Sequence, residues 1–365
     1  MHLRTKLSIV IALSTSGFLA ISCGKKNDKN ESTDGVQATS VAELKLSSAL
    51  DLTLPATLAK ASGQTSSLAL STNLVGKKSS EACRTIQQVT QMFDTLGSIS
   101  GMMCHLEAET AQIKFGTKYK IILTENGETN EMPLWIDNSV SGQLTMYTCQ
   151  AGAVREKISI TSSNGTGAKG SILFSGSDGA QNYASSLEFD FTSSSAKILK
   201  GQNTYINGSD AFSNDNVLEF RDPGVSFMTT ANKGSSNGMT FQDRGAVRHN
   251  GTLGQALFKG QGTGSGQTYD FSSRATFDAD GISVANTTAT SDIKIEATEL
   301  PSFLADGFKI AAPTGWDCQT TETITVDIDN GATGAAHKAC NRNHDMNFNC
   351  WGTDFEQGEN ETINN

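Results

Sequence analysis

The stretch Leu187-Glu188-Phe189-Asp190-Phe191 decides the fold class, because apolar and acidic side chains alternate strictly along it. A period of two is that of a β-strand with one buried and one solvated face. The same alternation recurs at 118–124, at 144–146 and at 292–297. From residue 111 to residue 299 the sequence therefore predicts about ten or more short strands in antiparallel succession.

Dipeptides typical of tight turns separate these runs, as expected for strands joined by hairpins. They are Asn126-Gly127, Asn164-Gly165, Asn207-Gly208, Pro223-Gly224 and Asp280-Gly281. A sheet with one apolar face has to close on itself, pack on a second sheet or be covered by a helix. We therefore expect a mainly β (α+β) protein: a large antiparallel sheet, or an open or half barrel, with an N-terminal helix packed on it.

Residues 79–106 are the best candidate for that helix. Ser79 or Ser80 can cap its start, and Glu81 suits the positive end of the helix dipole. Gly97 and Gly101 weaken its middle. Apolar residues recur along it at helical spacing, namely Cys83, Ile86, Val89, Phe93, Leu96, Ile99, Met103 and Leu106. Further outward, residues 44–54 predict a strand, and residues 300–316 predict a loop or a short helical turn.

The N-terminal segment indicates export. His2, Arg4 and Lys6 precede an apolar run from Leu7 to Ile21 that is shorter than a membrane-spanning helix. The run ends in Ala20-Ile21-Ser22-Cys23-Gly24, which resembles the lipobox of bacterial lipoprotein precursors, although Ala20 stands where Leu is commoner. The resemblance covers residues 1–24. It implies cleavage before Cys23, acyl chains on the Cys23 sulfur and, because Gly24 is not Asp, sorting to the outer membrane. An ordinary secretory signal is the alternative.

Six further cysteines predict a disulfide framework, as is usual for an exported chain. They are Cys83, Cys104, Cys149, Cys318, Cys340 and Cys350. Because three lie before residue 150 and three after residue 317, complete internal pairing requires at least one bridge between the two groups. The domains we expect are a signal peptide (1–22), a lipidated polar tether (23–40), a helix-plus-sheet body (41–317) and a Cys-rich C-terminal segment (318–365).

The net charge restricts the kinds of partner that the protein can bind. The sequence carries 38 acidic against 28 basic residues, and its formal net charge is −10. Such a chain is a poor candidate for nucleic-acid binding and is repelled by anionic lipid head groups. Membrane attachment therefore has to come from acyl chains on Cys23.

Motifs that carry catalytic chemistry are not matched. Gly260 to Gly266 is rich in glycine, but Ser265 stands at the third glycine position of a dinucleotide loop, so we interpret the stretch as a flexible hairpin loop. His337, Cys340, His344 and Cys350 have the density of a zinc site but no standard spacing, and disulfide bonding is the stronger interpretation. His105 and His249 stand apart from any nucleophile. We predict no catalytic, cofactor or metal residues.

Three hypotheses follow. The first is a non-catalytic outer-membrane lipoprotein that binds a protein partner or envelope polymer, or has a structural role there; the sequence does not decide which side of the membrane it faces. The second is a carrier of an apolar ligand, whose cavity would be lined by Phe189, Phe191, Ile293 and Ile295. The third is a hydrolase with a dispersed triad or with zinc at His337 and His344.

Overall fold

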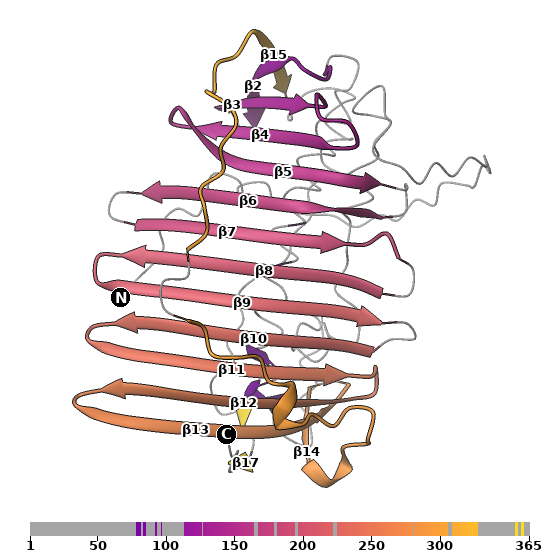
Figure 1. The fold of residues 1–365 in the computed structure, drawn as a ribbon, viewed down its shortest axis with the longest axis vertical. Coiled ribbons are helices and arrows are strands. Elements are labelled where there is room, and N and C mark those ends of the chain that lie inside the picture. Colours follow the sequence, from indigo (N-terminus) through magenta and orange to yellow (C-terminus); the bar gives the residue numbers. More distant parts are fainter. Residues whose placement is uncertain are drawn as a thin grey trace, which may run out of the picture. The chain divides into compact units, whose positions relative to one another are not determined.

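The computed structural model describes residues 113–327 apart from short gaps at 126, 164–166, 179–180, 194–195, 222–224, 280 and 306–308. It also describes residues 78–81, 83–84, 92, 96, 355–356 and 359–360. The protein is mainly β, and its strands form a large open sheet in the order β14-β13-β12-β11-β10-β9-β8-β7-β6-β5-β4-β3-β2-β15 (Figure 1). The mainly β fold class that the sequence predicts, with a large open sheet, is confirmed.

The described strands fall into two compact units. The first unit holds β2 (Lys118–Glu125), β3 (Glu128–Asp137), β4 (Leu144–Gln150), β5 (Ala153–Ser163) and β15 (Glu322–Asp327). β2 to β5 pair antiparallel with their neighbours along the chain, whereas β15 pairs with β2 in parallel. β15 thus belongs to the predicted Cys-rich segment and extends the sheet beyond β2. β6 (Ala168–Asp178) begins in this unit and continues in the second.

The second unit holds a run of long antiparallel strands. They are β7 (Gln181–Asp190), β8 (Ala196–Asn207), β9 (Asp210–Arg221), β10 (Val225–Ser236), β11 (Met239–His249), β12 (Leu253–Gly264), β13 (Gln267–Asp278) and β14 (Ser283–Val284). Short strands β1 (Lys78–Ser79), β16 (Phe355–Glu356) and β17 (Glu359–Asn360) and the 3-10 helices η2 (Asn286–Thr288) and η3 (Ala297–Glu299) complete it. Most of the strands have ten to twelve residues, so the expectation of short strands was wrong.

Tight turns set the strand register. Asn237-Gly238 and Ser265-Gly266 join β10 to β11 and β12 to β13, and both residues of each pair have positive φ. That conformation matches the right-handed twist of the flanking strands. The turns after β8, β10 and β12 lie along one side of the second unit, at the left of Figure 1.

The core of the first unit lies on one face of β2 to β5. Tyr119, Ile121, Leu134, Ile136 and Ile158 are each at most 1% exposed. They occupy alternate positions, as the period-two pattern at 118–124 requires, because successive side chains of a strand point to opposite faces. The sequence-derived strands at 118–124 and 144–146 are present as β2 and β4.

One face of the second unit carries an apolar row that includes Phe189, Leu199, Leu218, Met228 and Val247. These residues are direct cross-strand neighbours from β7 to β11, and each is at most 5% exposed. We name this face A and the opposite one face B. Burying such a row is the main favourable contribution to the stability of a sheet.

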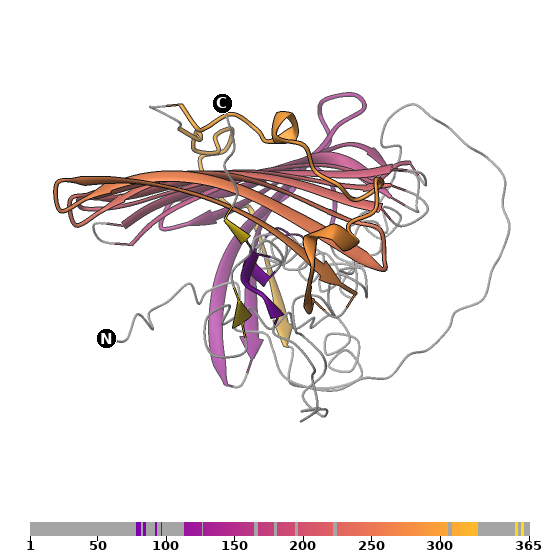
Figure 2. The same ribbon diagram turned by 90° about the horizontal axis from the view of Figure 1, so that it is seen from below.

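Face B of β11 and β12 is also buried, so these strands do not have the one solvated face that the sequence pattern predicts. Ala246 and Leu257 pack there against Ile295 and Leu300. Ile293 and Ile295 were predicted to lie in a strand, and that prediction was wrong: residues 292–296 run as an irregular strap that leads into η3. Figure 2 shows the orange chain after β14 passing along one side of these strands.

Hydrogen bonds involving side chains, and not strand pairing, hold this strap in place. Arg274 Nη1 donates to the Gln255 Oε1 at 2.6 Å and to the Ile295 carbonyl at 2.8 Å. Gln255 Oε1 in turn accepts from the Ile295 N–H at 2.9 Å, and Arg248 Nη1 donates to the Lys294 carbonyl at 2.8 Å. Backbone groups near Ile293 and Ile295 thus find partners without strand pairing, which explains why an alternating sequence is not a strand here.

Several segments for which the sequence makes a prediction lie outside the described residues: the signal, Cys23, the tether and the strand at 44–54. Of the expected helix at 79–106, six described residues are helical, namely Ser80, Glu81, Cys83, Arg84, Met92 and Leu96. Within the part of the chain that is described, no helix combines the length and the apolarity needed to span a membrane.

Candidate functional site

Most of the large apolar side chains exposed in the described residues gather on one surface. Met239 and Phe241 of β11 are 49% and 37% exposed, and Tyr269 and Phe271 of β13 are 49% and 39% exposed. Monomeric proteins rarely leave such groups clustered without a use. We call these four residues the aromatic patch.

Glycines of the strand between β11 and β13 form the floor of the aromatic patch. Gly260 and Gly262 of β12 are the direct cross-strand partners of Phe271 and Tyr269. A Cβ on Gly262 would stand 2.4 Å from the Tyr269 ring, and one on Gly260 would stand 2.3 Å from the Phe271 ring. Each ring therefore leans across its neighbour strand and covers the backbone of a glycine, an arrangement that compensates for the missing side chain.

The same pairing extends along one row of face A. Gly234 of β10 opposes Phe212 of β9 on one side and Phe241 of β11 on the other. The Phe212 and Phe241 ring centroids are 6.2 Å apart. Read across β7 to β13, the complete row is Tyr183, Tyr205, Phe212, Gly234, Phe241, Gly262 and Tyr269.

From β8 to β11 the next row of face A is polar and largely buried. Asn203 Nδ2 donates to Asn214 Oδ1 at 2.9 Å, and Asn232 Nδ2 donates to Asp243 Oδ1 at 2.7 Å. Burial raises the pKa of the Asp243 carboxyl, and the Asn232 amide and the positive charge of Arg84 partly oppose this shift. The Asn232–Asp243 bond links β10 to β11 in the row beside the aromatic patch.

The stretch from Gly260 to Gly266 is thus largely not a flexible loop, and that prediction was wrong. Residues 260–264 belong to β12, and only Ser265 and Gly266 make the turn. The signal that could have located the patch was present: counting back from a two-residue turn pairs Gly262 with Tyr269 and Gly260 with Phe271. We missed it because glycine usually indicates irregular chain.

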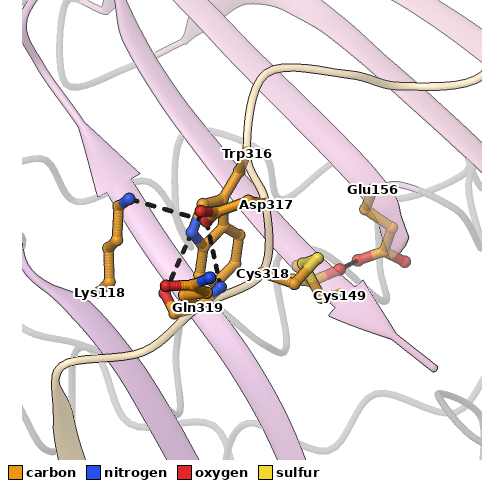
Figure 3. The surroundings of a disulfide bond; sticks show 8 residues. Lys118, Cys149, Glu156, Trp316, Asp317, Cys318 and Gln319 are labelled. Carbon is orange, nitrogen blue, oxygen red and sulfur yellow. Dashed lines mark hydrogen bonds and ion pairs between the residues drawn. A yellow bond between two sulfur atoms is a disulfide. The ribbon is translucent and has the colours of Figure 1, made fainter. Parts of the chain in front are cut away.

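A second cluster surrounds the disulfide between Cys149 and Cys318, which are 169 residues apart in sequence (Figure 3). Here Trp135 stacks on Tyr147 with ring centroids 5.1 Å apart, and Trp316 lies 6.1 Å from Trp135. Residues 315–319 cross the strands at this point, and we call them the clasp.

Polar contacts fix the clasp to β2 and close its own turn. Lys118 Nζ lies 3.9 Å from Asp317 Oδ1, and Trp316 Nε1 donates to the Gln319 carbonyl at 3.2 Å. Gly315 has a φ of 126°, and a Cβ there would stand 2.7 Å from the Tyr147 hydroxyl oxygen, so a side chain would be both strained and crowded. Because its rings pack on one another, we assign the clasp a structural role.

Among the cysteines predicted to be bonded, Cys83 also forms a disulfide. Cys104, Cys340 and Cys350 lie outside the described residues, as do His337, His344 and His105. His249 is described, and its side chain is 1% exposed. Burial lowers the pKa of His249 to about 4, its Nδ1 accepts from the Gly251 N–H at 3.0 Å, and its ring stacks on Phe277.

Comparison with known proteins adds no identification. No protein-family model matches the sequence, no curated protein matches it, and no solved structure matches the fold. The aromatic patch and its supporting rows are therefore the basis for a functional assignment.

Proposed function

We propose that this protein is a lipid-anchored lipoprotein of the outer membrane that binds a partner through the aromatic patch and catalyses no reaction. The observation that carries the binding role is the exposure of Met239, Phe241, Tyr269 and Phe271 on one face of β11 and β13. The anchor is supported by the sequence around Cys23, which resembles a lipobox. An acyl-anchored body with an exposed recognition surface suits a role in the cell envelope.

The carrier hypothesis finds less support. Phe189 and Phe191 are each at most 3% exposed, and Phe189 lies on face A in the same row as Val247. Ile293 and Ile295 are fully buried, and Ile295 packs on face B against Ala246 and Leu257. The four residues expected to line one cavity therefore do not share a surface.

The hydrolase hypothesis has no further support either. In the described parts of the chain, no three His, Cys, Asp or Glu side chains are placed to hold a metal ion. His249 is buried and neutral at physiological pH, which suits a packing role better than general base catalysis.

Fractionation of cells tests the anchor. Wild-type protein should sediment with membranes and carry fatty acid, whereas Cys23→Ser should be recovered in the soluble fraction. Fatty acid still attached to Cys23→Ser, or wild-type protein without fatty acid, would contradict acylation at Cys23.

Envelope binding by acyl-free protein tests the binding role separately. Purified Cys23→Ser protein should co-sediment with isolated cell envelopes, and adding Tyr269→Ala should reduce the bound fraction. Ile206→Ala provides a matched control, because Ile206 is also 49% exposed but lies on face B. Equal loss in the two variants would contradict a specific role for the patch.

A further inference from the structure

The rows that hold the aromatic patch lack cationic side chains. In β10 to β13 the ring row contains Gly234, Phe241, Gly262 and Tyr269, and the row beside it contains Asn232, Asp243, Gly260 and Phe271. Lys233, Arg244 and Lys259 are next to these residues in sequence, so their side chains point to face B. Asp243 and Asp210 place acidic groups near the patch, and the positive charge of Arg84 partly offsets that of Asp243. The strand residues on this face therefore offer no cation to phosphate, sulfate, nucleic acid or anionic lipid head groups.

The patch is also unsuited to the usual contacts between proteins. Interface hot spots are side chains that insert into pockets of the partner. Here the rings lean over glycines instead of projecting, and the floor between them is strand backbone. A flat surface made of ring faces favours a ligand that is itself flat on one side.

Sugar rings have that property. A pyranose presents C–H groups on one face and hydroxyl groups around its edge, and the negative face of an aromatic ring attracts those C–H groups. Uncharged polar side chains at the rim can serve the hydroxyl edge. Ser236, Asn237 and Gln267 stand beside the patch at the ends of β10 to β13.

The spacing of the rings favours a polymer over a single sugar. Phe212, Phe241 and Tyr269 lie on β9, β11 and β13, with Gly234 and Gly262 on the strands between them. The Phe212 and Phe241 ring centroids are 6.2 Å apart, and Tyr269 lies two strands beyond Phe241, so the three rings form one row across the strands. An extended chain running across the strands would meet one ring after another.

We propose that the aromatic patch, continued by Phe212, binds an uncharged, extended β-linked polysaccharide that runs across strands β9 to β13. This inference rests on the proposed function, since it assigns a ligand class to the same surface. The polymer stacks its sugar rings on Phe212, Phe241 and Tyr269, and its hydroxyl groups face the polar rim. The sugar backbone of the cell wall and polysaccharides from outside the cell share this chemistry.

Calorimetric titration of the detergent-extracted full-length protein tests the proposal. The probes are the hexamer and dimer of β-1,4-linked N-acetylglucosamine, the β-1,4-linked glucose hexamer, and heparin as the anionic control. We expect a hexamer to bind and the dimer to bind at least about tenfold more weakly, because one stacked ring contributes roughly a factor of ten. Heparin should not bind. Binding of heparin as tight as that of both hexamers, or binding by neither hexamer, would overturn the proposal.

Three variants locate the site. Tyr269→Ala should weaken hexamer binding about tenfold, since it removes one stacked ring. Gly262→Ala should also weaken it, because the new Cβ displaces the Tyr269 ring from the position it covers. Ile206→Ala should leave it unchanged. Unfolding curves that match the wild-type curve show that each variant is folded, and undiminished binding by folded Tyr269→Ala would overturn the assignment.

Sedimentation with purified cell-wall sacculi distinguishes the two sources of polymer. Patch-dependent binding to sacculi indicates the cell wall, and hexamer binding without sacculus binding indicates an external polysaccharide. If binding to whole envelopes depends on the patch but neither hexamer binds, the proposed ligand class is overturned and the proposed binding role still holds. If neither envelope binding nor hexamer binding depends on Tyr269, both proposals fail.

Discussion

Gly254 of β12 and Phe277 of β13 are direct cross-strand partners, and a Cβ on Gly254 would stand 2.4 Å from two atoms of the Phe277 ring. Phe277 is fully buried, and the His249 ring closes the other side. The Phe277 ring therefore occupies the volume that any larger residue at position 254 would need.

We predict that Gly254→Ala lowers the free energy of unfolding by about 1–3 kcal/mol, the usual cost of overpacking a core that cannot shift. Denaturant unfolding of the purified protein measures the loss.

Gly262→Ala is the control for this prediction. Its Cβ would meet the Tyr269 ring as closely as the Gly254 Cβ meets Phe277, but Tyr269 is 49% exposed and can swing into solvent. We expect a cost below about 1 kcal/mol there. Equal losses at the two positions would mean that ring burial does not decide the cost.

The mainly β architecture could be read from the sequence because the alternation at 187–191 and 118–124 is set by burial on one face, which is a local property. Glycine–aromatic pairing was less visible, since it depends on residues seven or more positions apart, such as Gly262 and Tyr269. Counting the register back from Ser265-Gly266 would have revealed it.

The strap at 292–296 could not be predicted for a different reason. Ile293 and Ile295 are buried as their alternation indicates, but long-range side chains, those of Arg248 and Arg274, satisfy the backbone there. Periodicity reports which residues are buried and not which groups complete their hydrogen bonds. Pairing between the early and late groups of cysteines was predictable from parity, but the choice of Cys149 and Cys318 was not.

We predict that removing the disulfide with Cys149→Ser and Cys318→Ser lowers stability by about 3–5 kcal/mol, because the bridge closes a long loop in the unfolded chain. The bridged residues are 169 positions apart. Tryptophan fluorescence during denaturant unfolding is a suitable measurement, since Trp135 and Trp316 pack beside the bridge.

The single variant Cys149→Ser serves as the comparison for the double variant. It breaks the same bridge and should lose nearly as much stability. A loss below about 1 kcal/mol in the double variant would show that the clasp holds without its covalent bond.

Arg274→Leu should destabilise the second unit by about 1–3 kcal/mol, because the Ile295 carbonyl and the Gln255 amide oxygen each lose a charged donor. The strap should also become more accessible, which hydrogen exchange at residues 293–296 would detect.

Lys294→Ala tests whether strap charges in general matter. Lys294 pairs with Glu296 at 3.0 Å, but their side chains are 58% and 62% exposed. Exposed pairs contribute little, so we expect almost no change in hydrogen exchange. A loss of protection as large as that of Arg274→Leu would contradict the role given to the Arg274 guanidinium.

His249 should make stability fall in mild acid. Its pKa is about 4 in the folded protein, because burial disfavours the charged ring, against 6.5 in an unfolded chain. Between these values the unfolded chain takes up a proton that the folded protein does not, so the free energy of unfolding falls as the pH falls. From pH 7 to pH 4 this contribution is about 3 kcal/mol.

His249→Gln does not titrate, and its unfolding free energy should lack this part of the pH dependence. Burial raises the pKa of Glu156 and Asp243, which produces the opposite slope, but both groups are common to the two proteins and cancel in the difference. Chemical denaturation of both proteins at several pH values gives the comparison, and parallel curves between pH 7 and pH 4 would show that His249 has the same pKa in the folded protein as in the unfolded chain.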